Sequence, residues 1–423
     1  MPDSPDAREI VHLIGSPSPQ AEEQVASVAS VLRKWGYPIR VLGPLTRSGR
    51  RLIASAGVPT RDLPPPSGDS VTERWGDARD QSQSVREARP ILVHAHGFGA
   101  MLAAIRARRA ISRPVPVVAS PHFQPHRLEE DPRLGMRRRV YRWLLNHSDA
   151  VVVPTDAQRD DLHALDEAAG ERAELVPYPR PAGAQPDSLD LGRRRSLLGI
   201  TQSAVVVGCI IDDLAEADLV TFLDAGASLC MDYPSIEFAL IGGDADRELY
   251  QNLAHQRGLL GATVFVDPGD LFRRAISALN VLVTPQRGWP SGMLALQALE
   301  ADVGVVAIEG GEVAEMLIRS PRVTIAPDEG PGALADGIIR RLRAAAAQME
   351  PARDSAPDAP LAASFLVSKD FYDIEASWAT PDAGAADSPD RQAADVIGEF
   401  DPTRSARALI AVYQRLLDED ASS

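Results

Sequence analysis

Apolar and polar positions along the chain follow two alternating periods. Short apolar runs, such as 10–15 and 150–154, have the composition of buried strands, and segments such as 21–35 repeat apolar residues at helical spacing. The two kinds of segment follow one another in turn, which predicts βαβ units and a parallel sheet with helices on both faces. In the first part of the chain the expected strands are 10–15, 38–43, 91–94, 115–119 and 150–154, and the expected helices are 21–35, 100–110 and 137–146.

The same alternation begins again after a break that is dense in Pro, Gly and Arg, which predicts a second doubly wound domain. Its expected strands are 204–211, 236–242, 263–266, 281–284 and 304–308, and its expected helices are 218–231, 247–258, 293–301, 313–319 and 331–348. We therefore divide the chain into a domain at 1–180, a linker at 181–203, a domain at 204–348, an insertion at 349–399 and an amphipathic helix at 400–423. The insertion is rich in Ala, Asp, Pro and Ser, and we expect much of it to be disordered.

Composition narrows the classes of function. The chain has 423 residues, which favours two domains, and a net charge of -15, which argues against nucleic-acid binding. Cys209 and Cys230 fit no metal or disulfide spacing, so we expect reduced thiols. We also expect no metal site and no cofactor. The polar, acidic start of the chain does not resemble a signal peptide, and no apolar run is long enough to span a membrane. We expect a cytoplasmic protein.

Several motifs occur in the order and spacing of one known family. The first domain contains ILVHAHGFGAMLAA at 91–104, SPH at 120–122 and LLNHSDAVVVPTDAQRDDL at 144–162. The second contains FALIGGDADRELYQNLAHQRGL at 238–259 and ALNVLVTP at 278–285. Together they resemble the family-4 retaining glycosyltransferases. That resemblance implies a GT-B fold, in which two Rossmann-like domains enclose a cleft, and transfer of a sugar from a nucleotide-diphosphate donor to a cell-envelope or metabolite acceptor.

The stretch PQRGWPSGMLALQALE at 285–300 aligns without a gap to the family's Glu-x7-Glu donor loop. In the family, the first Glu meets the donor sugar and the second the nucleotide ribose; here Trp289 and Gln297 stand in those places. Trp289 either fills the vacated volume or stacks on a sugar or base. Gln297 retains the capacity to hydrogen-bond a ribose hydroxyl. The expected backbone cradle for the diphosphate is formed by Ser291, Gly292, Met293 and Leu294.

The resemblance also implies an Arg and a Lys that neutralise the leaving diphosphate. Their places fall on Ile210 and near Ala215, where the local charges are acidic. A diphosphate beside carboxylates is repelled unless a cation intervenes, and Arg287 is one candidate to supply it. Two hypotheses therefore remain: a divergent glycosyltransferase, and a non-catalytic pseudo-glycosyltransferase that serves as a scaffold or regulatory partner. The replaced donor-site residues slightly favour the second hypothesis, the pseudo-glycosyltransferase.

His122 is the candidate catalytic residue, because it occupies the place of the family's cleft histidine. A loop histidine with a structural hydrogen bond is the equal alternative. His94 and His96 are expected at a strand end that faces the cleft, and for His96 we favour a packing or turn role.

Two further stretches suggest partners. The one from Arg133 to Leu145 is basic and aromatic, which allows peripheral contact with the inner face of a membrane, although a solvated helix face is the favoured interpretation. The apolar island from Phe365 to Trp378 is either a protein-binding segment or an extra edge element. The acceptor and the donor sugar stay open.

Overall fold

The computed structural model describes residues 9–65, 67, 71–112, 115–122, 134–181, 189–202, 204–212, 214–242, 246–267, 272–353 and 396–421. They form two compact units. The first combines Met1–Gly183, Gly288–Met293 and Phe400–Ser423, and the second combines Ala184–Arg287 and Leu294–Glu399. The disordered insertion that we predict falls almost entirely outside the described residues, as does the whole of 365–378.

The first unit is a seven-stranded parallel sheet in the order β3-β2-β1-β4-β5-β6-β7. Its strands are β1 Ile10–Ile14, β2 Ile39–Gly43, β3 Thr60–Asp62, β4 Leu92–His96, β5 Val117–Ser120, β6 Ala150–Val153 and β7 Ala173–Leu175. Its helices are α1 Pro19–Lys34, α2 Arg47–Ser55, α3 Val71–Ala88, α4 Phe98–Arg109, α5 Leu134–Asn146, α6 Asp156–Leu165, α7 Glu167–Glu171 and α18 Pro402–Ala421.

Alternate residues of these strands face opposite layers of helices, as the period of a strand requires. On one face, Val11, Val93 and Val117 pack into a core with residues of α4 and α5. On the other, Ile10 and Leu92 pack with residues of α1 and α18. Both faces of the sheet are therefore buried, which is why its strands read as nearly continuous apolar runs.

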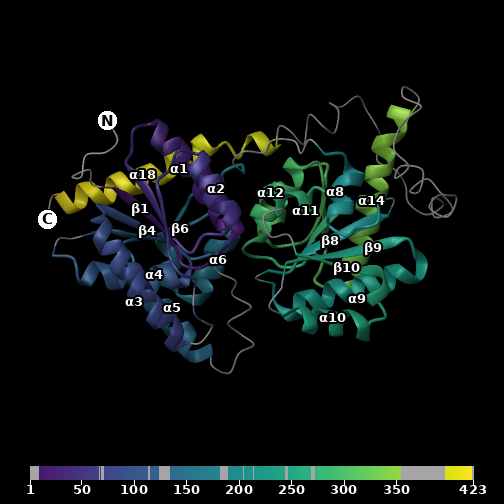
Figure 1. Cartoon of the computed structure of the whole chain (residues 1–423), viewed down its shortest axis with the longest axis horizontal. Helices are drawn as coiled ribbons and strands as arrows, with labels where there is room; N and C mark the ends of the chain where they lie inside the picture. Colours follow the sequence, from purple (N-terminus) through teal and green to yellow (C-terminus); the bar gives the residue numbers. More distant parts are fainter. Residues whose placement is uncertain are drawn as a thin grey trace. The chain divides into compact units, whose positions relative to one another are not determined.

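The last helix of the chain returns to the first unit. In Figure 1, α18 (yellow) lies along α1, and apolar residues of the two helices share one core with β1. Arg415 of α18 also forms an ion pair with Glu174 of β7, with a shortest distance of 2.5 Å. The C-terminal helix is thus part of the first unit, and it brings its side chains against the strands that start the chain.

The second unit is a six-stranded parallel sheet in the order β10-β9-β8-β11-β12-β13. Its strands are β8 Val205–Ile210, β9 Ile236–Ile241, β10 Thr263–Val266, β11 Val281–Thr284, β12 Gly304–Ile308 and β13 Val323–Ala326. The remaining helices are α8 Leu191–Leu197, α9 Glu216–Asp232, α10 Arg247–Gln256, the short 3-10 helix η3 Leu260–Ala262, α11 Phe272–Ile276, α12 Ser291–Glu300, α13 Glu312–Leu317 and α14 Pro331–Arg353.

Helix α8 lies inside the range that we predict as a linker. Its Arg195 is completely buried and donates hydrogen bonds to the carbonyl oxygens of Ala278, Gln202 and Ala204 and to Asn280 Oδ1. A buried guanidinium satisfies several carbonyls at once, so this helix is held firmly to the second unit.

Candidate functional site

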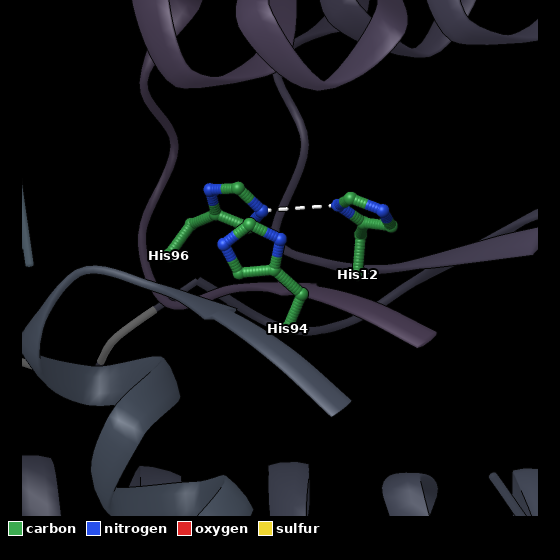
Figure 2. A group of neighbouring side chains, drawn as sticks. All are labelled: His12, His94 and His96. Carbon is green, nitrogen blue, oxygen red and sulfur yellow. Dashed lines mark hydrogen bonds between the residues drawn. The ribbon is translucent and has the colours of Figure 1, made fainter. Parts of the chain in front are cut away.

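Three histidines stand side by side on two neighbouring strands of the first sheet. His12 lies on β1, and His94 and His96 lie on β4. His12 is the register partner of His94, and residues two apart on a strand point the same way, so the three side chains share the sheet face covered by α1 and α18. Figure 2 shows the three rings gathered in one place, and each residue is at most 4% exposed.

Hydrogen-bond contacts link these rings to three further side chains in one continuous chain. The successive contacts are His122 Nε2 to His96 Nδ1 at 3.1 Å, His96 Nε2 to His12 Nδ1 at 3.1 Å, His12 Nε2 to Tyr413 Oη at 3.4 Å, Tyr413 Oη to His94 Nδ1 at 2.6 Å, and His94 Nε2 to Ser120 Oγ at 2.8 Å. A neutral imidazole has one N–H and one lone pair, so each ring can donate at one contact and accept at the other. The chain therefore links six polar side chains, five of them buried, with no charged group in it.

Burial keeps the four rings neutral. It lowers the pKa of His12 to about 4 and that of His122 to about 3. The pKa values of His94 and His96 also lie well below the usual value, first because of burial and then because neighbouring histidines would repel a second positive charge. At neutral pH each ring consequently keeps a lone pair that can accept a hydrogen bond or bind a metal ion.

The histidine cluster borders a small cavity in the first unit. Its lining includes the three strand histidines, Ser120 and His122. The centre of a water molecule can reach about 20 Å³ of it, enough for a water or an ion but not for a nucleotide. Among the described residues, His12, His94 and His96 are the group whose ligand atoms lie close enough to hold a metal, within 4.8 Å of one another.

His122 and Trp289 meet within the first unit. His122 directly follows Pro121 at the end of β5 and has a positive φ of 46°, a conformation that is uncommon for a non-glycine residue. Trp289 belongs to the segment Gly288–Met293 of the same unit and is buried. Its ring centroid lies 4.0 Å from that of His122 and 6.0 Å from that of Tyr178. Both of these predicted site residues are therefore packed against aromatic rings.

Arg287, the candidate phosphate cation, is already engaged in the second unit. Its Nε donates to the carbonyl oxygen of Glu309 at 3.1 Å, and its Nη1 lies 3.0 Å from Glu329 Oε1 in an ion pair that is largely exposed. The carbonyl oxygen of Arg287 accepts from the amide of Glu312 at 2.9 Å. A Cβ on Gly311 would come within 2.8 Å of the Arg287 backbone, so a glycine is required beside this loop.

The remaining predicted donor residues begin helix α12. Ser291, Met293 and Leu294 are at most 1% exposed, and Gly292 is buried as well. The amide of Ser291, in the expected cradle, donates to the carbonyl oxygen of Gly288 at 3.0 Å.

Gln297 lies further along the same helix and is 5% exposed. No group in the described part of the chain hydrogen-bonds its Oε1, and the same holds for Oε1 of Gln286, on the loop after β11. A buried acceptor without a donor is unfavourable by about 1–3 kcal/mol, so each oxygen suits a hydroxyl or amide from a ligand.

The end of β8 carries the residues that align with the family's Arg and Lys. Ile210, at the position of the family's Arg, ends β8 with 1% exposure. Asp212 follows it, and its carboxylate lies so close to Gly242 that a Cβ there would come within 2.4 Å of it. Ala215 precedes α9 and has no charge to offer.

The basic stretch from Arg133 to Leu145 corresponds to α5, and Arg133 itself lies outside the described residues. Tyr141, Leu144 and Leu145 are buried in the core, and Trp143 packs against it. The exposed side chains that the structure describes on this helix include Arg138. Its aromatic residues thus face the protein, and contact with a membrane stays a prediction that rests on the basic residues. No helix in the described part of the chain is long and apolar enough to cross a membrane.

Two members of the histidine chain do not appear among the residues predicted from the sequence. His12 sits in an apolar strand whose position beside β4 depends on the sheet order. Tyr413 lies in the last helix, 401 residues away from His12. The sequence did contain one indication for His12: like His94, it follows a valine within a predicted strand.

Comparison with known proteins agrees with this architecture. Residues 21–179 match the model of the Glycosyl transferase 4-like domain. No curated protein sequence gives a significant match.

Solved structures match over nearly the whole chain. HepE from Anabaena, in complex with UDP and glucose, has 16% identity and a TM-score of 0.66 over 96% of this chain and 99% of its own. Sucrose-phosphate synthase from Thermosynechococcus elongatus has 14% identity and a TM-score of 0.65 over 98% of this chain and 100% of its own. A UDP-GlcNAc 2-epimerase from Neisseria meningitidis, bound to UDP-GlcNAc, has 12% identity and a TM-score of 0.55 over 79% of this chain and 91% of its own.

These matches establish the fold. The two parallel α/β sheets form a GT-B-like fold, as the sequence predicts, and residues 21–179 resemble a glycosyl transferase 4-like domain. Since an epimerase shares the fold with a synthase, the fold alone does not determine the reaction.

Proposed function

We propose that this protein is a glycosyltransferase that takes its sugar from a nucleotide-diphosphate donor. The match at 21–179 and the GT-B-like fold support the class. UDP or a UDP-sugar occupies HepE and the epimerase, so a uridine nucleotide is the first donor to test.

The observation that carries the proposal is the unpartnered amide oxygen of Gln297. It is buried in α12 at the place of the family's ribose-binding Glu, and it has no hydrogen-bond donor among the described residues. A ribose hydroxyl would supply that donor and remove the cost of leaving a buried oxygen unsatisfied. The bond to a neutral amide is weaker than one to a carboxylate, so we expect weaker donor binding than a Glu would give.

His122 is the proposed substrate-contacting group in the first unit. Burial keeps its ring neutral, and its Nε2 contacts His96, which leaves Nδ1 as the nitrogen available to a substrate hydroxyl. The proton ordering of the histidine chain decides whether Nδ1 donates or accepts, because each neutral ring has a single N–H. His122 is therefore suited to orient a hydroxyl, not to act as a cation.

The decisive experiment is a calorimetric titration with UDP, GDP, ADP and their sugar conjugates, followed by an assay for sugar release or transfer. We expect one nucleotide to bind and Gln297→Leu to weaken it about tenfold, equivalent to about 1.4 kcal/mol. Gln251→Leu, on the exposed face of α10, is the matched control and leaves binding unchanged. Unaltered binding in Gln297→Leu would remove the main support for the proposal.

The second candidate is a pseudo-glycosyltransferase that binds partners without transferring sugar. Asp212 at the carboxyl edge of β8 and the ion pair of Arg287 with Glu329 favour it, since both make a diphosphate site less positive. Arg287→Ala separates the candidates: it lowers turnover of a working transferase through a weakened hold on the diphosphate. Nucleotide binding with no sugar release, unchanged by Arg287→Ala, would select the pseudo-enzyme.

A further inference from the structure

The separation of the strand histidines suits metal coordination. His12 Nδ1 and His96 Nε2 are 3.1 Å apart, and a ligand nitrogen of His94 lies within 4.8 Å of both. Two imidazole nitrogens on one tetrahedral zinc ion, each at 2.0–2.1 Å, lie about 3.3 Å apart. The 3.1 Å between His12 Nδ1 and His96 Nε2, which now spans a hydrogen bond, therefore needs to widen by only a few tenths of an ångström to hold a metal ion.

Each histidine also has an outer hydrogen-bond partner for the nitrogen that a metal would not use. His12 Nε2 contacts Tyr413, and His96 Nδ1 contacts His122. His94 contacts Tyr413 through one nitrogen and Ser120 through the other, so one of these contacts remains when the other nitrogen turns to a metal. Such outer partners fix the tautomer and the ring orientation of metal-binding histidines.

The N–H protons of the hydrogen-bond chain can be arranged so that no proton lies between His12 Nδ1 and His96 Nε2. If His96 donates from Nδ1 to His122 and His12 donates from Nε2 to Tyr413, then His12 Nδ1 and His96 Nε2 both present lone pairs across 3.1 Å. Two facing lone pairs repel each other, and a cation between them turns that repulsion into two bonds. Only tautomers change in this rearrangement, so these two rings release no net proton.

We propose that His12, His94 and His96 bind one divalent transition-metal ion, for which Zn²⁺ is the reference. Neutral imidazoles are common ligands of zinc, copper, nickel and iron, whereas calcium and magnesium prefer oxygen. The rings of His94 and His96 are stacked, with centroids 4.2 Å apart, so binding requires His94 to tilt and to give up one of its two present bonds. This metal site was not predicted from the sequence, from which we expect none.

Three neutral ligands leave the ion with its full charge, and a buried charge needs compensation. The cavity bordered by all three histidines supplies the space, since its volume fits a water or a small anion. Three protein ligands with an open fourth position is the arrangement of zinc sites that bind water, hydroxide or a substrate oxygen. The fourth ligand is consequently a hydroxide or an anionic oxygen. This inference does not rest on the proposed donor function.

The test uses the full-length protein after treatment with EDTA and removal of the chelator. Co²⁺ is titrated while its visible absorption is followed, and Zn²⁺ then displaces it to give the zinc affinity. We expect one equivalent to bind. X-ray absorption of the zinc-loaded wild type is expected to show three imidazole nitrogens at about 2.0–2.1 Å.

Variants locate the site. His96→Gln and His12→Asn remove a ligand and are expected to weaken zinc binding more than 100-fold. Ser120→Ala removes only an outer partner, and we expect a loss of about 10-fold. His163→Gln, an exposed histidine at the end of α6, is the control and binds zinc like the wild type.

Three results would overturn the proposal. The first is a wild type that does not bind one equivalent of metal. The second is an X-ray absorption spectrum of the wild type that shows fewer than three imidazole ligands. The third is binding that survives unchanged in His96→Gln and His12→Asn. The wild-type spectrum decides the matter even where a ligand variant fails to fold.

Discussion

Replacement of Arg195 by methionine is predicted to loosen the second unit more than any change on its surface. The guanidinium is 0% exposed and donates four hydrogen bonds of 2.8–3.0 Å. Burial lowers its pKa to about 10, which still leaves it charged at neutral pH. One acceptor, Asn280 Oδ1, also accepts from the amide of Val206 at 2.8 Å, so the network ties α8 to β8 and to the start of β11.

The magnitude follows from what the substitution leaves behind. Methionine fills much of the same volume but donates nothing, so three carbonyl oxygens and Asn280 Oδ1 each lose a donor. An unsatisfied buried acceptor costs about 1–3 kcal/mol, and removal of one partner from a buried charged network costs about 3–5 kcal/mol. Some acceptors recover water, and the charge no longer has to be buried. We therefore expect a loss of about 3 kcal/mol in the free energy of unfolding.

Urea denaturation gives that free energy, and hydrogen exchange followed by mass spectrometry assigns it to a region. We expect faster exchange in β8 and β11 and unchanged exchange in β1 and β4, which belong to the other unit. Arg193→Met, on the exposed side of the same helix, is the control and is expected to cost less than 0.5 kcal/mol or so. A loss below about 1 kcal/mol for Arg195→Met, with exchange unaltered in β8, would refute this account of α8.

Two further predictions concern the first unit. Burial raises the pKa of Glu22, even though hydrogen bonds from Thr46 oppose the shift. The folded state therefore loses stability as the pH rises from the unfolded pKa of 4.5 through the folded pKa. Glu22→Gln should abolish this fall in urea titrations across that pH range, whereas parallel curves for the two proteins would contradict the prediction. Gly43→Ala places a Cβ within 2.6 Å of the Ile14 carbonyl oxygen, while the Cβ of Gly36→Ala, at φ 91°, meets nothing within 4 Å. Left-handed strain at Gly36 costs roughly 1 kcal/mol of stability, and thermal melts should show a clearly larger loss of stability for Gly43→Ala. Equal losses would show that the close approach does not matter.

Most strands and long helices follow from the apolar pattern because both sheets are parallel and buried on both faces. The predicted strands at 10–15, 38–43 and 150–154 correspond to β1, β2 and β6. Short or polar elements escaped the pattern. Helix α3 at Val71–Ala88 is mostly polar, and β3 at Thr60–Asp62 is a short edge strand, so neither shows a clear apolar period.

The candidate site was harder to anticipate than the fold, because it depends on contacts between distant segments. The resemblance singled out His122, and the sequence predicted His94 and His96 at a strand end, which β4 confirms only for His96. No local pattern states that β1 lies beside β4 or that the last helix returns to cover them. For that reason Tyr413, which links His12 to His94, was not predicted.

The measurement that tests the central claim most directly is calorimetric titration of the wild-type protein with UDP and UDP-glucose. The account predicts one site and a thermal stabilisation of about 2.7 kcal/mol at 100 times the dissociation constant, with both effects reduced in Gln297→Leu and preserved in Gln251→Leu. No binding of any nucleotide or nucleotide sugar at millimolar concentration would contradict it.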